Sequence, residues 1–192
     1  ERNLLWNCGD HGIQSAQDSI IANNIILGAA ADGISLQPHQ AGVPGNQRVL
    51  HNTVFNTGGS AIVVRNAAGS VVVANNAVYT DGTAAAIRIV GSDATVILAG
   101  NVGQGGLEGS SQNGLATGSI GADFVDAHLN GVPPIDCFPA EGSALIGVAD
   151  AQYLTETDFN GTPRAGSRDA GAYRYDPAGN PGWTLGPGFK DM

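Results

Sequence analysis

The sequence predicts an all-β fold, a parallel β-solenoid of about five coils that ends in an irregular C-terminal cap. Three observations predict it: 29 glycines among 192 residues, a charged fraction of only 13%, and an internal repeat of about 24 residues. Chains rich in Gly, Val, Ile and Asn but poor in Lys and Glu favour short strands joined by tight turns. A repeat of this length fits one coil, in which each strand pairs with its equivalents in the neighbouring coils.

Asparagines that begin short apolar runs anchor the repeat. They are spaced 21, 28, 24 and 25 residues apart, and an isoleucine follows four of the five by ten or eleven residues. A third set, of apolar residues, stands three positions before the last four asparagines. The asparagines are Asn3, Asn24, Asn52, Asn76 and Asn101, the isoleucines are Ile13, Ile34, Ile62 and Ile87, and the third set is Ile21, Val49, Val73 and Leu98.

Each set is expected to form a column along the solenoid. Alternation along a strand places the isoleucines in the core and the residues that follow them, such as Gln14 and Arg88, on the outside. The asparagines are expected at left-handed turn positions, with their amides hydrogen-bonded into a ladder along the stack. A β-sandwich with coincidental spacing is the alternative fold.

The register of the repeat ends after Gly103. The coils are therefore predicted over residues 1–103, and residues 104–192 are assigned to the remainder of the chain. This remainder begins with a long loop over 104–122, rich in Gly, Ser, Gln and Asn, continues with irregular short strands and ends in a capping segment. A cap is expected because an uncovered last coil exposes backbone groups and apolar side chains.

The capping segment carries the string DFNGTPR, from Asp158, and the string DAGAY, from Asp169. Asp158 and Asn160 predict an Asx-type turn with Gly161 at positive φ, and Arg164 is expected to pair with Asp158 or Asp169. The functional alternative for Asp158 and Asn160 is an incomplete calcium loop, although the further ligands of such a loop are missing. We therefore expect no cofactor and no metal, with calcium at these two residues as the one weak candidate.

The chain opens in the middle of a repeat, since the first recognisable coil starts at Asn3. Unpaired backbone groups at a sheet edge attract further strands, and Trp6 lies close to this edge. We expect earlier coils, or a protein partner, to continue the solenoid before Glu1. On this interpretation the chain is the C-terminal part of a longer solenoid.

The composition argues against two classes of partner. A net charge of -9, from 8 basic and 17 acidic residues, disfavours nucleic acid, which is bound by basic residues that replace counterions. No apolar run approaches the roughly 20 residues of a membrane span. Two cysteines, Cys8 and Cys137, are compatible with one disulfide, but the sequence leaves their pairing open.

The asparagine-led coils, the string GSALI from Gly142 and the two tail strings resemble secreted bacterial right-handed parallel β-helix proteins of the pectate-lyase-like superfamily. The likeness covers nearly the whole chain and is greatest to surface proteins with a D-x-N-G-x-x-R…D-x-G-A-Y tail. It implies a right-handed parallel β-helix in a secreted, periplasmic or cell-surface protein. It implies no single activity, because this fold carries lyases, hydrolases, epimerases, adhesins and inert spacers.

A ligand site is expected on the outward face of the strands that hold the isoleucines, beside the loop 37–46. This loop lengthens the longest coil, of 28 residues, and insertions in solenoids gather on the face that binds. Two arginines fall on this face, and guanidinium groups suit the carboxylate of an acidic sugar. A solvated polar face with a tolerated loop is the alternative. The predicted ligand residues are Gln14, Ser35, Gln37, His39, Arg65 and Arg88.

Two local strings bear on catalysis. The string DGISLQPHQ, from Asp32, resembles the Asp-Pro-His-Asp strand of mannuronan C5-epimerases, but Gln37 and Gln40 replace both acids, and glutamine cannot transfer protons. The string CGDHGI, around His11, resembles the Gly-His-Gly strand of polygalacturonases, for whose aspartates Asp32 is the one candidate. Inverting hydrolysis needs two carboxyl groups about 6.5–9.5 Å apart. The catalytic residues stay unknown, with His11, Asp32 and His39 as weak candidates.

Three functions from different classes remain open. The favoured one is a non-catalytic β-helix domain that binds a polysaccharide, a cell-surface glycan or another surface partner. The second is a polysaccharide-active enzyme, namely a uronate lyase, C5-epimerase or hydrolase, whose missing residues lie upstream. Lyase chemistry lacks an acidic cluster facing the two arginines of the coils. The third is a structural subunit of an extracellular assembly.

Overall fold

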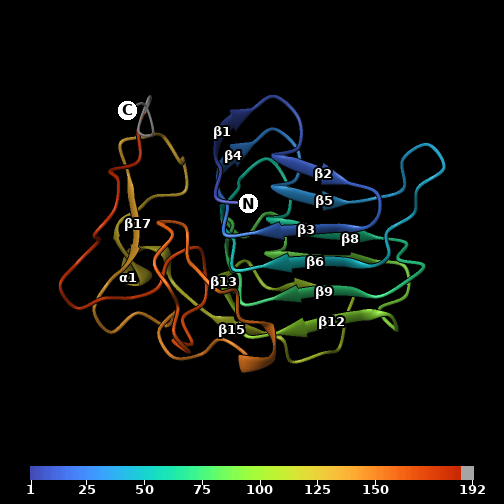
Figure 1. The fold of residues 1–192 in the computed structure, drawn as a ribbon. Coiled ribbons are helices and arrows are strands. Elements are labelled where there is room, and N and C mark those ends of the chain that lie inside the picture. The colour runs from blue at the N-terminus through green and yellow to red at the C-terminus, as the bar shows by residue number, and fades with distance from the viewer. Residues whose placement is uncertain (187–192) are drawn as a thin grey trace.

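The computed structural model describes residues 1–186 and has the predicted all-β fold. Three parallel sheets wind into a right-handed parallel β-helix, and the C-terminal part of the chain packs along one side of it (Figure 1). Sheet A contains β1 (Leu4–Cys8), β4 (Ile25–Ala29), β7 (Thr53–Phe55), β10 (Ala77–Tyr79), β13 (Asn101–Gln104) and β15 (Leu115–Thr117). Sheet B contains β2 (Ile13–Ser15), β5 (Ile34–Leu36), β8 (Ile62–Arg65), β11 (Ile87–Val90) and β14 (Leu107–Glu108). Sheet C contains β3 (Ser19–Ala22), β6 (Gln47–Leu50), β9 (Val71–Ala74) and β12 (Val96–Ala99).

The first four coils each contribute one strand to each sheet, and a partial fifth coil follows. β13 and β14 begin this fifth coil, which adds no described strand to sheet C, and β15 then returns to sheet A. The segment 104–122, expected to be a loop, therefore contains two strands that continue the parallel pairing. Leu107 extends the isoleucine column beside Ile87, and Leu115 pairs with Asn101. The repeat is hard to recognise here because leucine replaces both the isoleucine and the asparagine.

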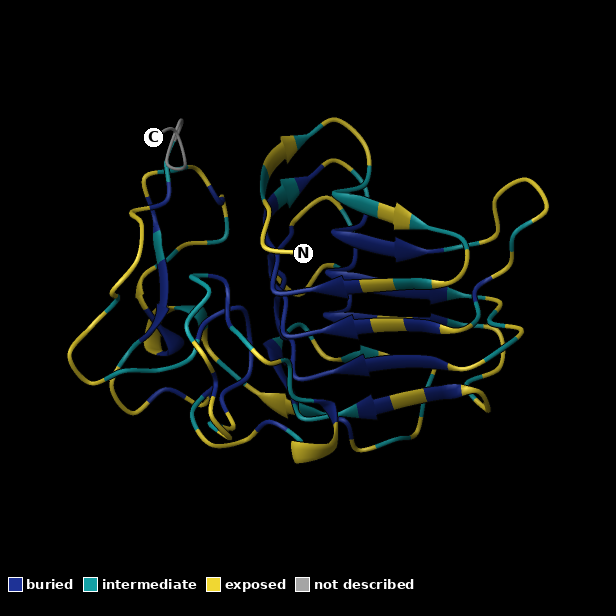
Figure 2. Cartoon of the chain, in the orientation of Figure 1, coloured by how far each residue is buried: buried dark blue, intermediate teal, exposed yellow. Residues whose placement is uncertain are grey.

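The predicted apolar columns are confirmed. The isoleucines pair in register through sheet B, and the third set pairs in register through sheet C. Both columns point inward, where they join alternate residues of sheet A in one core. The first coil is the most exposed, as Figure 2 shows, because each of its strands has a neighbour on one side only.

Replacing Ile62 with alanine is expected to lower the free energy of unfolding by about 3 kcal/mol, because the side chain is fully buried and held between Ile34 and Ile87. The stacked backbone cannot collapse into the cavity that this change leaves. Urea unfolding of the two chains measures the difference. A loss below about 1 kcal/mol would contradict the assignment of this column to the core.

The asparagine ladder is confirmed along five coils. The side-chain amide of Asn24 donates to the Oδ1 of Asn52 at 2.9 Å, and Asn52 donates in the same way to Asn76 at 3.0 Å. Each Oδ1 also accepts the backbone N–H of the preceding ladder residue, as Asn76 does from Asn52 at 2.9 Å. The same contacts join Asn3 to Asn24 and Asn76 to Asn101.

The expected left-handed conformation of the ladder asparagines is wrong by one residue. The positive φ values belong to the residues that precede them: Asn23, His51 and Asn75, at 52°, 52° and 60°, and Gly100 at 60°. Two neighbouring residues of each turn therefore have different roles. The first residue supplies the left-handed bend, and the second supplies the buried amide that bonds along the stack.

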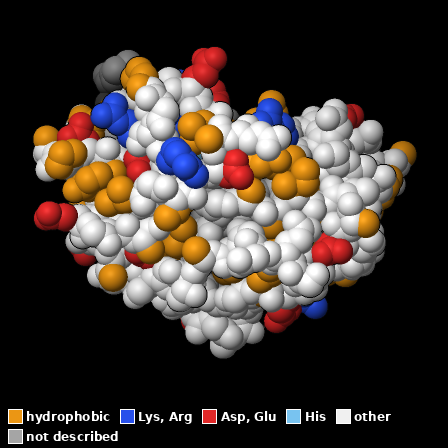
Figure 3. Space-filling view, turned by 90° about the horizontal axis from the view of Figure 1, so that it is seen from below, with side chains coloured by type: hydrophobic (Ala, Val, Ile, Leu, Met, Phe, Trp, Pro, Cys, Tyr) orange, Lys and Arg blue, Asp and Glu red, His pale blue; other side chains and the backbone are white. Residues whose placement is uncertain are grey.

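The C-terminal segment covers the side of the solenoid as well as following its last coil. It contains α1 (Ile120–Asp123), the antiparallel pair β16 (Phe124–Asp126) and β17 (Asp136–Pro139), and the short helix η1 (Ala151–Tyr153). Its apolar side chains pack on the outward face of sheet A, where the Phe124 ring lies 5.0 Å from that of Phe55 and 5.1 Å from that of Tyr79. Seen from the side of the last coil, the surface shows small apolar groups and isolated charges (Figure 3).

The tail turns where predicted, with Gly161 at positive φ, but the Asp158 side chain bonds the residue four positions on instead of the two of an Asx turn, and Arg164 has other partners than expected. Asp158 Oδ1 accepts the backbone N–H of Thr162 at 2.8 Å, and Gly161 has a φ of 82°. The Arg164 guanidinium donates to backbone carbonyls, those of Gly171 at 2.9 Å and Asp169 at 3.3 Å among them, rather than to the side-chain carboxylate of Asp158 or Asp169. Backbone carbonyls replace the expected carboxylate because the tail folds its own chain around the buried guanidinium.

Two further features follow from the fold. Cys8 in β1 and Cys137 in β17 are free thiols, so the open question of their pairing is answered in this structure. Within residues 1–186, no helix has the length and apolar character needed to cross a membrane.

Candidate functional site

The outward face of sheet B carries most of the predicted ligand residues. The register of the sheet aligns Gln14, Ser35, Val63 and Arg88 in one column, with Gln14 and Arg88 exposed. Ser35 and Val63 also point away from the core but are covered by neighbouring side chains. We call Gln14, Ser35, Gln37, Arg65 and Arg88 the polar strip.

A hydrogen-bonded chain joins the middle of the polar strip. Arg65 Nη1 donates to Ser35 Oγ at 3.2 Å, and that hydroxyl donates to Gln37 Oε1 at 3.2 Å. Arg65 Nη2 forms an ion pair with Asp32 Oδ2 at 3.0 Å. The Arg65 side chain keeps 30% of its surface exposed. It is therefore held in one orientation while part of its guanidinium still faces solvent.

Asp32 is the structural centre of this cluster. Its side chain is only 10% exposed, and its other oxygen, Oδ1, accepts the backbone N–H of Ser60 at 3.0 Å. Asp32 thus connects the turn of the next coil to Arg65. Both carboxylate oxygens have partners, which fixes the orientation of the group.

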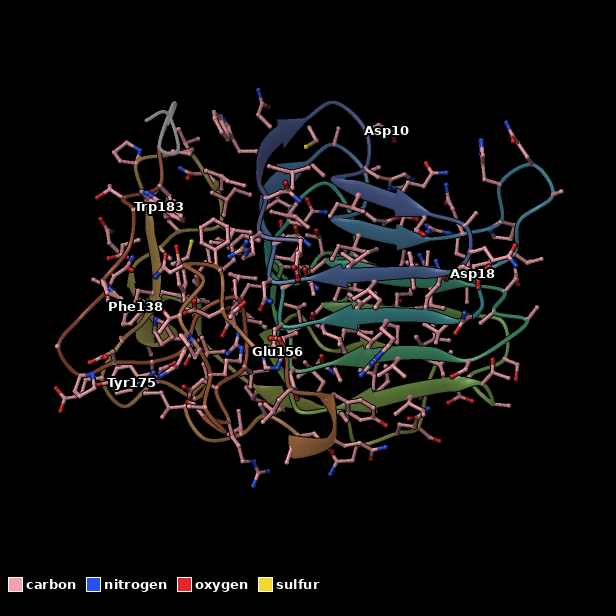
Figure 4. The ribbon with its side chains drawn as sticks, viewed as in Figure 1. Asp10, Asp18, Phe138, Glu156, Tyr175 and Trp183 are labelled. Carbon is pink, nitrogen blue, oxygen red and sulfur yellow. The ribbon has the colours of Figure 1, made fainter. Side chains whose placement is uncertain are left out.

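His11 lies beside Asp32, as the sequence suggested, but its geometry is that of a structural contact. Its Nδ1 accepts the backbone N–H of Asp32 at 3.1 Å and lies 3.6 Å from Asp32 Oδ2. A neutral imidazole whose Nδ1 accepts carries its proton on Nε2, so neither nitrogen is free to take a proton from a substrate. The Nε2 lies 4.0 Å from Asp10, which marks the turn before β2 in Figure 4.

The structure does not bring His39 to His11 and Asp32. His11 and Asp32 precede β2 and β5, whereas His39 follows β5, so these groups lie toward opposite ends of sheet B. His39 is exposed at the base of a small hairpin, where its backbone exchanges two hydrogen bonds with Gly42 at 3.0 and 2.9 Å. The three weak catalytic candidates therefore do not form one constellation.

Each arginine of the polar strip has an acidic neighbour, which the sequence did not reveal. Arg65 pairs with Asp32, and Arg88 Nε lies 3.5 Å from Glu108 Oε2. Glu108 was hidden because it belongs to the fifth coil, beyond the recognisable repeat. The second pair is open to solvent, with side chains 51% and 61% exposed, so it holds Arg88 only weakly.

Of the two calcium candidates in the tail, Asp158 has protein partners at both carboxylate oxygens, whereas Asn160 Oδ1 is buried without a hydrogen-bond partner among the described residues. Asp158 Oδ2 accepts the backbone N–H of Arg174 at 3.0 Å, in addition to the bond from Thr162 at Oδ1. The Asn160 amide donates to Asn180 Oδ1 at 3.0 Å. Among residues 1–186, no group of three or more His, Cys, Asp or Glu side chains is placed to hold a metal ion.

A cavity of about 590 Å³ lies outside the predicted site, at the start of sheet A. Trp6 and Cys8 of β1 line it together with residues of β4 and the segment 130–132. The signal in the sequence was Trp6 itself, one of two tryptophans, at an outward position of the first strand.

Comparison with known proteins bears on the fold. Residues 1–78 match the family model described as right handed beta helix region. The matched part spans the first three coils, including the asparagine ladder as far as Asn76. Among curated proteins and among solved structures, nothing matches the chain. The family match thus supports the β-helix fold of the coils, and none of the comparisons indicates an activity.

Proposed function

We propose that the chain is a non-catalytic β-helix domain that binds a glycan along the outward face of sheet B. The observation that carries this proposal is the polar strip, in which Gln14 and Arg88 are exposed in one column and Arg65 lies beside Ser35. A glycan presents hydroxyl groups along its whole length. The accessible amide and guanidinium side chains of Gln14, Gln37, Arg65 and Arg88, on four successive coils, offer donors and acceptors for them, while the buried Ser35 hydroxyl helps to position Arg65. The proposal places the protein outside the cytoplasm, secreted or at a cell surface.

The arrangement of Arg65 and Arg88 favours a glycan with acidic sugars. Arg65 is held in place by Asp32, which lowers the entropy that binding would otherwise cost. Arg88 has a single contact of 3.5 Å to an exposed glutamate, and such surface pairs contribute only about 0–1 kcal/mol. A uronate carboxylate that meets Arg88 as a bidentate partner can replace Glu108 at little cost.

The same geometry supports binding over catalysis. Hydrolysis of a glycan needs two carboxyl groups on one face. Two lie beside His11, Asp32 at 3.6 Å and the exposed Asp10 at 4.0 Å, but only Asp10 is open to a substrate. Asp32 is buried, and its oxygens already accept from Arg65 and from Ser60. A carboxylate in this position orients Arg65 rather than attacking or protonating a substrate.

We expect the double variant Gln14→Ala with Arg88→Ala to bind uronate polysaccharides at least about tenfold more weakly, because a charge-assisted hydrogen bond contributes about 1.5–3 kcal/mol. Affinity electrophoresis on a panel of acidic and neutral polysaccharides identifies the ligand, and calorimetry measures the dissociation constant. Arg48→Ala is the matched control, because Arg48 is an exposed arginine on sheet C.

Two outcomes would overturn this proposal. If Arg48→Ala weakens polysaccharide binding as much as the double variant does, the polysaccharide is attracted to positive charge on any face of the protein. Binding that neither variant changes would place the glycan away from sheet B. Incubation with the same polysaccharides adds a third test, since we expect no shortening and no unsaturated ends, and either product would identify an enzyme.

A further inference from the structure

The cavity at the start of sheet A exists because the covering segment stops short of the first coil. Register places Trp6 beside Leu27, and Leu27 beside Phe55, in one outward column. The C-terminal segment buries Leu27 and Phe55 to 1% and 0% exposure, yet Trp6 remains 39% exposed. A large, partly exposed aromatic side chain thus lines a cavity of about 590 Å³, within the range of small-molecule sites.

The floor of this cavity is backbone with small side chains. Gly28 and Gly58 lie on it, and a Cβ built on Gly9 or Gly28 meets no atom within 4 Å, so the space above these residues is open. The wall is formed by the segment 130–132. Gly131, at a φ of 60°, lets this segment lie directly on Leu27, whose backbone would be 3.0 Å from a Cβ there.

The floor is also rigid. The buried side chain of Asn56 accepts the backbone N–H of Ala29 at 2.7 Å and donates to the carbonyls of Ala31 at 2.7 Å and Gly59 at 3.1 Å. These bonds fix two successive turns against each other. A site built on such turns is preorganised, because no loop needs to be ordered when a ligand binds.

The described lining carries no charged side chain. Its polar side chains are Asn7, Thr57 and Asn130, together with the Cys8 thiol. Burial raises the pKa of the Cys8 thiol, so this group also stays neutral at physiological pH. Acidic sugars and phosphates therefore find no counter-charge among these residues, whereas a neutral ligand with hydroxyl groups finds amide donors and acceptors.

We propose that this cavity binds one neutral sugar ring, which stacks its apolar face on Trp6 and directs its hydroxyl groups to the amides of Asn7 and Asn130. A pyranose ring has such a face, formed by its C–H groups, and an aromatic ring is a large and rigid partner for it. The inference rests on the proposed glycan-binding function and adds a subsite for an uncharged sugar. The turns that form the cavity floor lead directly into His11 and Asp32, so one glycan chain can reach both the cavity and the polar strip.

Tryptophan fluorescence tests this subsite directly. The chain has two tryptophans, and Trp183→Phe leaves Trp6 as the single reporter. Neutral oligosaccharides of glucose, galactose and mannose, and the matching uronic acids, are titrated into this variant. We expect a saturable change in Trp6 emission with at least one neutral sugar and a weaker response to its uronic acid.

Two variants and one control locate the effect. Trp6→Ala is expected to weaken neutral-sugar binding, measured by calorimetry, at least about tenfold, since the stacking contact is lost. Gly9→Leu keeps Trp6 but fills the open space, and the same loss is expected. Arg88→Ala is expected to leave neutral-sugar binding unchanged. Circular dichroism verifies that each variant retains the fold.

The proposal is overturned if no neutral sugar gives a saturable response, or if Trp6→Ala and Gly9→Leu bind as the parent does. It is also overturned if uronic acids bind better than their neutral counterparts in the Trp6 assay. These outcomes are distinct from failure of the proposed function, which is read from the polysaccharide affinity of the polar-strip variants. If the polar-strip variants lose polysaccharide binding but Trp6→Ala and Gly9→Leu bind as the parent does, the protein is a glycan-binding domain that lacks this subsite.

Discussion

Arg164→Ala is expected to lower the free energy of unfolding by about 3–5 kcal/mol, the range for removing one partner of a buried charged network. Arg164 is the largest fully buried side chain of the described residues, with 1% exposure. Its Nη2 donates to the carbonyls of Gly171 and Ala172 at 2.9 and 3.2 Å, and to Asn23 Oδ1 at 3.2 Å. Alanine removes the Arg164 donor from the buried Gly171 carbonyl, and a buried acceptor left unsatisfied costs about 1–3 kcal/mol. The Ala172 carbonyl keeps the backbone N–H of Phe159, and Asn23 Oδ1 keeps the Thr155 hydroxyl, so these two acceptors lose one of two donors.

Charge adds to this effect. Burial lowers the pKa of Arg164 to about 10, while the negative charges of Asp158 and Asp169 oppose the decrease, so the guanidinium stays charged at neutral pH. Its removal leaves two buried carboxylates without a compensating cation. Arg164→Lys keeps the charge but loses the planar fork, and we expect it to recover only a minor part of the stability.

Urea unfolding measures the loss, and amide hydrogen exchange locates it. Exchange should rise first over residues 155–175, because Arg164 joins this part of the tail to Asn23 of the solenoid. Arg168→Ala is the matched control, since Arg168 is exposed and donates to one carbonyl, that of Ala149, at 2.7 Å. If both variants lose the same free energy of unfolding, burial of Arg164 adds nothing to its contribution to stability.

The columns of the solenoid could be predicted because residues of the same kind stand at nearly fixed distances from the asparagine of each coil, although the coils differ in length. An isoleucine pointing inward and an asparagine in the turn repeat in every recognisable coil, so a sequence without coordinates already contains the register. The two asparagine pairs, at 23–24 and 75–76, have members with different roles. The second member forms the ladder, whereas the first contacts the tail, as Asn75 does through Asp150 at 2.7 and 3.1 Å.

The position of the tail could not be predicted, because its contacts join residues far apart in the sequence, some by more than a hundred positions. Asn23 donates to the carbonyl of Thr157, and Ala172 donates to the Thr53 hydroxyl. Such contacts are specific to this pair of segments and leave no periodic pattern. The candidate site was predicted in part for the same reason. The outward column of sheet B follows from alternation, but the ion pair of Asp32 with Arg65 depends on how a turn meets a strand one coil later.

His51 makes the stability of the solenoid depend on pH. It occupies the left-handed position before Asn52, is fully buried, and its Nε2 lies 3.1 Å from the Asn75 amide nitrogen. The pKa of His51 is lowered from its ordinary value of 6.5 to about 3, chiefly by burial and also by the nearby Arg164 guanidinium, against the opposing effect of backbone groups of Gly171, Asp169 and Tyr153. The folded chain therefore holds this imidazole neutral.

Acidification from pH 7 to pH 5 is expected to destabilise the fold by about 2 kcal/mol through His51 alone. The unfolded chain binds a proton below pH 6.5 that the folded chain excludes until about pH 3, so stability is present above 6.5 and falls as the pH decreases through this window.

His51→Asn removes the titration and keeps a residue that tolerates positive φ, as Asn23 and Asn75 do in adjacent coils. Urea unfolding at both pH values should show a loss about 2 kcal/mol smaller in His51→Asn than in the parent. His128→Asn, at an exposed position, should leave the pH dependence unchanged. Equal pH dependence in the parent and in His51→Asn would mean that this imidazole is protonated inside the fold.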